Sequence, residues 1–122
     1  MLQALFLLGA LAQNPTGAVT APSVDDAAAR CPDCEEWNRP RTPFKLHGRS
    51  FYVGVEGLSA VVIATNAGLI LLDGGLPQSA ARIEDNLAAL GFRVRDVRLI
   101  VNSHAHYDHA GRIARLQRDT GP

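Results

Sequence analysis

The sequence has few cysteines, no excess of either charge and no hydrophobic run long enough to cross a membrane. Only two cysteines occur, which excludes a structural zinc site built from four cysteines. Twelve basic and twelve acidic residues give a formal net charge of +0, so nothing favours a nucleic-acid or membrane-surface partner. The most apolar stretch, residues 1–12, is shorter than the roughly 20 residues that a membrane span needs. Hydrophobic residues make up 47% of the 122 positions and charged residues 20%, which is typical of one small globular domain.

The first residues, MLQALFLLGALA, are similar to the apolar core and small-residue cleavage region of a secretory signal. We predict a signal peptide over residues 1–20, although the usual positive charge before the apolar run is missing. A buried N-terminal helix is the alternative. The signal predicts a periplasmic or secreted protein, with residues 21–122 as the mature chain.

The two cysteines form a Cys-Pro-Asp-Cys motif at Cys31 and Cys34. A redox-active pair of this kind belongs on a strand-to-helix turn, and here the flanking residues give no such context. In an exported protein the pair can form a local disulfide, and two free thiols are the alternative. Both remain open from the sequence, and neither gives the pair a function.

Alternating and continuous apolar patterns predict an α/β domain. Residues 37–44 contain Pro40 and Pro43 and are expected to form an irregular arm, because proline prevents a continuous helix. Short turns between the first apolar runs favour antiparallel strands, and a later helix-strand-helix order favours a parallel neighbour. The expected strands are 51–55, 58–65, 69–73 and 97–101, and the expected helices are 78–90, capped by Gly91, and 108–118.

The histidines are concentrated in one run, Asn-Ser-His-Ala-His-Tyr-Asp-His-Ala-Gly over residues 102–111. Imidazole and carboxylate groups are the usual ligands of zinc. In an extended chain alternate side chains point to one side, so His104, His106 and Asp108 would share one space, and a turn would bring His109 beside Asp108. The pattern predicts two neighbouring metal positions, with His104 and His106 on one and Asp108 and His109 on the other. Polar residues without a metal are the alternative.

A second acidic residue, Asp73, closes a buried strand and is followed by Gly74 and Gly75. Glycines in this position often mark a close approach to a site, although a plain turn would have the same sequence. Because the metal loop also follows a strand, we expect the Asp73 carboxylate to orient that loop.

The run His-x-His-x-Asp-His over residues 104–109 resembles the signature of the metallo-β-lactamase superfamily. The flanking segments 71–78, 85–86 and 96–100 are similar to the third subclass of class B β-lactamases, and the resemblance extends from about 37 to 121. It implies that residues 21–122 are the N-terminal half of an αββα sandwich, truncated before the second half. This half would be a mixed sheet with helices on one face.

The resemblance also implies a zinc-dependent hydrolase of the β-lactam ring, hence antibiotic resistance, with two zinc ions per complete domain. His104 and His106 would bind the first ion, and Asp108 and His109 the second. Asp108 would also act in catalysis by positioning the attacking hydroxide, and Asp73 would steady the metal loop. The partner would be a small β-lactam, with no nucleic acid and no membrane; the oligomeric state cannot be predicted.

Two features depart from the family pattern. Arg112 stands where members often have glycine or proline, and the charged side chain could either alter the packing or project toward a substrate. The other half of the fold would supply the missing ligands, so the 122-residue chain is expected to bind zinc weakly, to hydrolyse nothing and to leave one apolar sheet face open. The alternatives are a lactonase or thioesterase of the same superfamily, or a non-catalytic metal-binding half domain.

Overall fold

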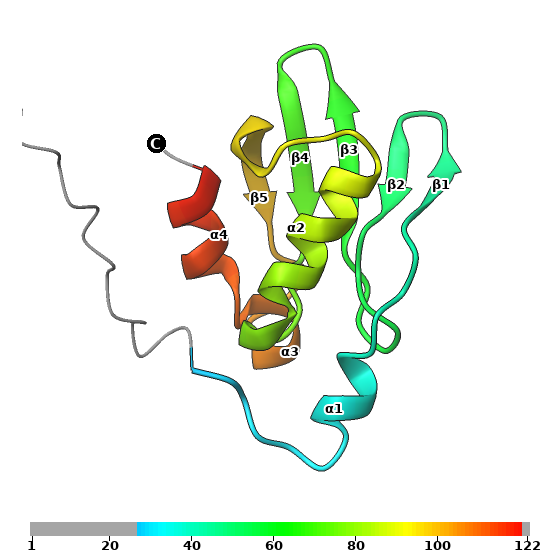
Figure 1. Ribbon diagram of the computed structural model, residues 1–122. Helices are drawn as coiled ribbons and strands as arrows, with labels where there is room; N and C mark the ends of the chain where they lie inside the picture. The colour runs from blue at the N-terminus through cyan, green and yellow to red at the C-terminus, as the bar shows by residue number, and fades with distance from the viewer. Residues whose placement is uncertain (1–26, 121–122) are drawn as a thin grey trace, which may run out of the picture.

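The computed structural model describes residues 27–120, and at its centre is a five-stranded sheet (Figure 1). The strands lie in the order β1-β2-β3-β4-β5. The first four pair antiparallel, whereas β5 runs parallel to β4, so the predicted mixed sheet is confirmed. Their bounds are β1 Phe44–His47, β2 Ser50–Tyr52, β3 Val61–Thr65, β4 Gly68–Leu72 and β5 Val97–Val101.

The helices that pack on the sheet lie on one of its faces, as expected (Figure 1). The two longest are α2, Ala80–Ala89, and α4, Ile113–Thr120, and the shorter ones are α1 Cys34–Trp37, η2 Pro77–Ser79, η3 Val94–Asp96 and α3 Tyr107–Ala110. Gly91 follows α2 with a φ of 82°, the left-handed conformation predicted for its cap. Within residues 27–120 no helix combines the length and hydropathy that crossing a membrane requires.

Strand alternation divides the apolar residues between two faces of the sheet. On the covered face, Val62 and Leu71 are fully buried and pack against Ile83 and Leu87 of α2 and Leu116 of α4. Because burying a side chain of this size stabilises the fold by about 1.5–3 kcal/mol, this layer is the main core of the described chain.

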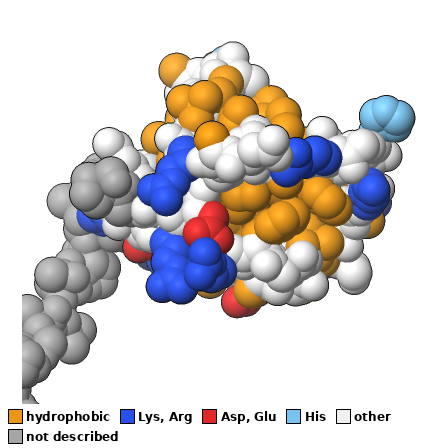
Figure 2. All heavy atoms as spheres, turned by 90° about the horizontal axis from the view of Figure 1, so that it is seen from above, with side chains coloured by type: hydrophobic (Ala, Val, Ile, Leu, Met, Phe, Trp, Pro, Cys, Tyr) orange, Lys and Arg blue, Asp and Glu red, His pale blue; other side chains and the backbone are white. Residues whose placement is uncertain are grey.

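The opposite face has no covering layer among residues 27–120. Leu99 and Val101 are 51% and 42% exposed, and they lie beside Ile70 and Leu72 in the paired register. Phe44, on β1, is 40% exposed. Seen from above, hydrophobic side chains form exposed patches on the molecule (Figure 2). The expected open apolar face is therefore present.

Three predicted element boundaries were wrong. The strand predicted over 51–55 ends at Tyr52, and the chain then enters a tight loop that backbone hydrogen bonds close, from the Val53 N–H to the Ala60 carbonyl and from the Val55 N–H to the Leu58 carbonyl. The Tyr52 hydroxyl lies within hydrogen-bond distance of the Val55 and Leu58 carbonyls of this loop. The strand predicted over 58–65 therefore starts only at Val61. The helix predicted over 108–118 is split between Ala110 and Ile113 into α3 and α4.

The segment before the sheet is partly ordered by the two cysteines. Cys31 and Cys34 form a disulfide, so the alternative of two free thiols is wrong. Cys34 is buried in a second, smaller cluster with Val55, Leu58 and Leu76, against which Trp37 packs. The packing of Cys34 and Trp37 thus places α1 against the loop that joins β2 and β3, and the disulfide ties residue 31 to the start of this helix. The predicted signal peptide, residues 1–20, lies outside the described residues.

We expect reduction of this disulfide to lower the free energy of unfolding by about 2 kcal/mol, because the cross-link restricts the unfolded chain over a short loop. Urea unfolding with and without a reductant measures the difference. A variant with Cys31→Ser and Cys34→Ser should show no response to the reductant, and an equal response in both proteins would contradict the prediction.

Candidate metal centre

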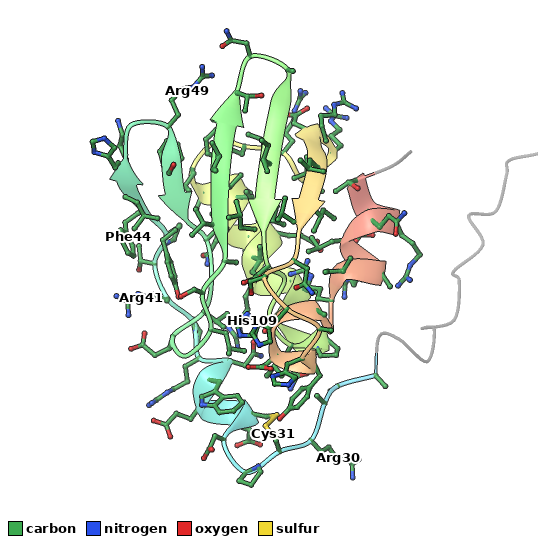
Figure 3. The ribbon with its side chains drawn as sticks, turned by 180° about the vertical axis from the view of Figure 1, so that it is seen from behind. Arg30, Cys31, Arg41, Phe44, Arg49 and His109 are labelled. Atoms are coloured by element: carbon green, nitrogen blue, oxygen red, sulfur yellow. A yellow bond between two sulfur atoms is a disulfide. The ribbon has the colours of Figure 1, made fainter. Side chains whose placement is uncertain are left out.

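The histidine run occupies the loop at the carboxyl end of β5, beside the carboxyl end of β4. The two strands are parallel, so their ends meet at one edge of the sheet, where sheets of this kind place their sites. The loop backbone turns into α3 at Tyr107, with His106 as its N-cap residue in an extended conformation. His109 lies at the end of the sheet nearest to the disulfide (Figure 3).

The structure brings the four predicted ligands together. Ligand atoms of His104, His106 and Asp108 all lie within 4.8 Å of one another. The fourth, His109, joins this group through Asp108, since its Nε2 is 3.4 Å from Asp108 Oδ2. The His104 and His109 rings have centroids 4.0 Å apart. How these side chains divide between two ions stays a prediction.

Asp73 lies directly behind the loop. Its Oδ1 accepts a hydrogen bond of 2.7 Å from the backbone N–H of Ser103, and its Oδ2 is 3.0 Å from His109 Nδ1. Asp73 has a φ of 59°, a left-handed conformation that aspartate tolerates better than most residues. The turn at Asp73 and Gly74 is therefore also the contact that holds the metal loop.

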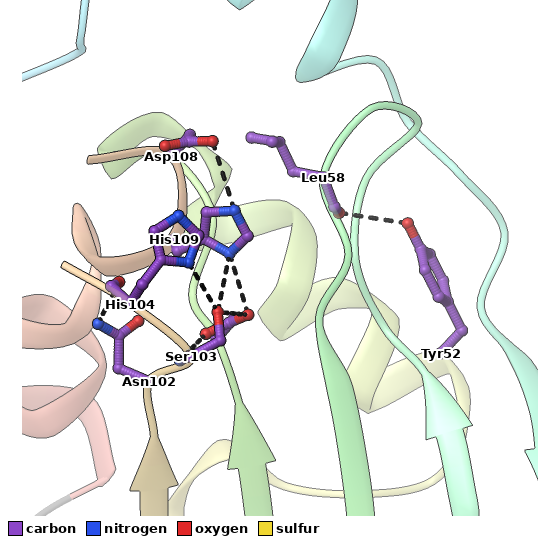
Figure 4. A network of polar contacts seen from close by, with 8 residues as sticks. Tyr52, Leu58, Asn102, Ser103, His104, Asp108 and His109 are labelled. Carbon is purple, nitrogen blue, oxygen red and sulfur yellow. Dashed lines mark hydrogen bonds and ion pairs between the residues drawn. The ribbon is translucent and has the colours of Figure 1, made fainter. Parts of the chain in front are cut away.

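The pKa of Asp73 reflects these contacts. Burial by itself would raise the pKa, but the hydrogen bonds from Ser103 and His109 outweigh it, and the pKa lies below its usual value. The carboxylate is therefore charged near neutral pH and can hold the Nδ1 side of His109, which leaves Nε2 directed toward Asp108 (Figure 4).

The sequence reasoning gave no role to Ser103, and the structure shows one. Its Oγ donates to Asp73 Oδ2 over 2.8 Å and lies 3.1 Å from His104 Nδ1. Ser103 thus joins Asp73 to two of the histidines, and Figure 4 shows its contacts with His104 and His109. The sequence did contain a signal for this role: Ser103 lies between the end of a strand and the ligand run, and its hydroxyl can both donate and accept a hydrogen bond.

Arg112 does not project toward the centre. Its side chain is 0% exposed, and it forms an ion pair of 2.6 Å with Glu84 of α2. Burial lowers the pKa of Arg112 to about 10, against the opposing effect of Glu84, so the side chain stays charged at neutral pH. Arg112 was expected either to alter the packing or to project toward a substrate, and the structure shows that it is part of the packing.

The donor set fits zinc. Two imidazoles and a carboxylate place their ligand atoms within 4.8 Å of one another, and these nitrogen and oxygen donors are the ones that catalytic zinc sites use. His104 and His106 are exposed and Asp108 is partly buried, so an ion can enter from solvent.

Comparison with known proteins identifies the family. The model of the metallo-β-lactamase superfamily matches residues 53–122. The structure is similar to the Rm3 metallo-β-lactamase, with 51% identity and a TM-score of 0.72 over 75% of this chain and 34% of that one. It is also similar to MEM-A1, a subclass B3 metallo-β-lactamase from a soil metagenome library, with 55% identity and a TM-score of 0.67 over 69% of this chain and 32% of that one.

A third similar structure is BJP-1, a subclass B3 metallo-β-lactamase of Bradyrhizobium japonicum, with 45% identity and a TM-score of 0.70 over 72% of this chain and 33% of that one. The chain therefore matches about a third of the length of each of these proteins. The histidine loop lies inside the matched family region, at the sheet edge described above. The chain therefore belongs to the metallo-β-lactamase superfamily, and it resembles members of subclass B3.

Proposed function

We propose that this chain carries the metal loop of a zinc-dependent hydrolase that opens the β-lactam ring and thereby gives antibiotic resistance. One observation carries the proposal: His104, His106 and Asp108 place their ligand atoms within 4.8 Å of one another in a chain of this superfamily. Similar structures include named subclass B3 β-lactamases, which favours a β-lactam over other substrates.

Zinc supplies, when bound, a Lewis acid for the lactam carbonyl and a water of lowered pKa. The residues of this chain hold and orient the site. Asp73 fixes the loop through Ser103 and His109. Asp108, 23% exposed, offers a carboxylate oxygen that can accept the proton of an attacking water and orient it. His104, His106 and His109 supply ring nitrogens as ligands.

We also propose that the protein is exported to the periplasm or secreted. The apolar start of the sequence supports this, and so does the disulfide, because such bonds persist mainly in oxidising compartments. Fractionation of cells that express the chain with its natural start tests the proposal, since retention of the uncleaved chain in the cytoplasm would contradict it.

Hydrolysis of a carbapenem, followed by its absorbance, tests the activity. We expect turnover from the chain extended through its reading frame beyond Pro122, and we expect a chelator to abolish that turnover and added zinc to restore it. The 122-residue chain should bind zinc without turnover, because catalytic zinc usually keeps three protein ligands and two ions would share the four side chains here.

A matched pair of variants controls the experiment. His106→Ala removes a ligand and should abolish turnover, whereas His47→Ala changes an exposed histidine on β1 and should leave turnover unchanged. Zinc binding without β-lactam turnover, together with hydrolysis of a lactone or thioester, would assign a different substrate class. Zinc binding without any turnover would favour a non-catalytic metal-binding domain.

A further inference from the structure

Arg112 is buried at the base of the metal loop and has no role in the site described so far. It lies three residues after His109, between α3 and α4, and is the largest of the fully buried side chains. Its Nε has no hydrogen-bond partner. Burying a guanidinium with one unpaired N–H is costly, so simple filling of the core does not explain this residue.

The contacts of the guanidinium reach across to α2. Nη1 donates to the backbone carbonyl of Ser79 over 2.9 Å, and Nη2 donates to Glu84 Oε1 over 2.6 Å. The first contact is with the N-cap residue of α2 and the second is with the middle of this helix, which packs on the sheet through the main core. Arg112 therefore joins the end of the loop to a firmly packed helix.

The aliphatic part of the side chain lies against the turn that holds the loop. Arg112 Cβ is 3.3 Å from the position that a Cβ on Gly74 would take. The Gly74 N–H donates to the His109 carbonyl over 2.9 Å, and the neighbouring Asp73 carboxylate contacts the His109 ring. The backbone and the ring of His109 are thus both held by a turn that Arg112 supports from behind.

We propose that Arg112 is a positioning residue, which anchors the carboxyl end of the metal loop to α2 and so fixes the places of Asp108 and His109. The side chain acts through Gly74 and Glu84 and touches no substrate. This inference rests on the metal binding proposed above.

The first test uses amide hydrogen exchange of the metal-free, full chain. In Arg112→Met, the amides of Gly74 and Ser103 should exchange about tenfold faster relative to those of the central strand β4, because the loop opens locally. Arg95→Met makes the same chemical change at an exposed position. It should leave the exchange rates of Gly74 and Ser103, each divided by the rate of β4, unchanged. Equal acceleration at the loop and at β4 would overturn the proposal, since Arg112 would then serve only global stability.

A double variant separates anchoring from folding. Replacing a buried ion pair with apolar residues is often neutral for stability, so Arg112→Met with Glu84→Leu should keep the urea midpoint of Arg95→Met while the two loop amides still exchange faster. Failure of both Arg112 variants to fold would overturn the proposal, because the arginine would then be needed for the core itself.

The second test is cobalt(II) binding, followed by the visible absorption of the bound ion. We expect the dissociation constant to rise about tenfold in the double variant, in line with the effect of losing partners that orient ligands. In Arg112→Lys it should lie between the value of the unmodified chain and that of the double variant. Unchanged cobalt affinity with fast loop exchange would overturn the role in positioning ligands. If the unmodified chain bound no cobalt, the proposed function would fail at its metal step, while the exchange ratios would still decide whether Arg112 anchors the loop.

Discussion

Asp73→Ala is expected to weaken metal binding about 10- to 100-fold, the usual effect of removing a group that orients metal ligands. The carboxylate accepts from the Ser103 backbone and from its hydroxyl, and it also contacts His109 Nδ1. Its loss would free the His109 ring to rotate and would leave the Ser103 N–H without its partner. Cobalt titration of the metal-free protein measures the effect.

Two further variants make the result specific to Asp73. Asp85→Ala removes an exposed aspartate from α2 and should leave the affinity unchanged. Asp73→Asn keeps an acceptor for Ser103 but removes the charge, so its affinity should lie between those of the wild type and Asp73→Ala. An Asp73→Ala protein that binds cobalt as tightly as the wild type would show that the loop holds its shape without this contact.

The candidate site was predictable because its groups are close in the sequence. His104, His106 and Asp108 fall within five residues, so the loop brings them together even though Asp108 lies on α3 and not in the extended segment that alternation assumes. Asp73 was predictable from its place at a strand end. The roles of Ser103 and Arg112 were not, because they depend on contacts with Asp73 and Glu84, about 30 positions away in the sequence.

The fold was predictable where apolar periodicity is strong and less so where a tertiary contact decides. The helix predicted over 78–90 corresponds to η2 and α2. The loop after β2 is closed by backbone hydrogen bonds and by contacts of the Tyr52 hydroxyl with two loop carbonyls, and no local sequence pattern predicts these contacts. Strand β1 was missed because Phe44–His47 has only four residues and follows two prolines.

Replacing leucine by alanine is expected to have a large effect on stability on the covered face of the sheet and a small effect on the open face. Leu71→Ala is expected to lower the free energy of unfolding by about 2–5 kcal/mol, since Leu71 is 0% exposed and alanine would leave a cavity in the main core. Leu99→Ala, on the open face, should change it by less than about 0.5 kcal/mol, because Leu99 is 51% exposed. Urea unfolding of the 122-residue chain measures both.

The same pair of variants can reveal what covers the open face. In the chain extended beyond Pro122, a second layer packed on this face would bury Leu99, and the cost of Leu99→Ala would rise toward that of Leu71→Ala, about 2–5 kcal/mol. The cost of Leu71→Ala should hardly change, because α2 and α4 already cover that side. If Leu99→Ala stayed near zero in both proteins, the apolar face would remain open to solvent, and the added chain would have to complete the metal site from the edge of the sheet.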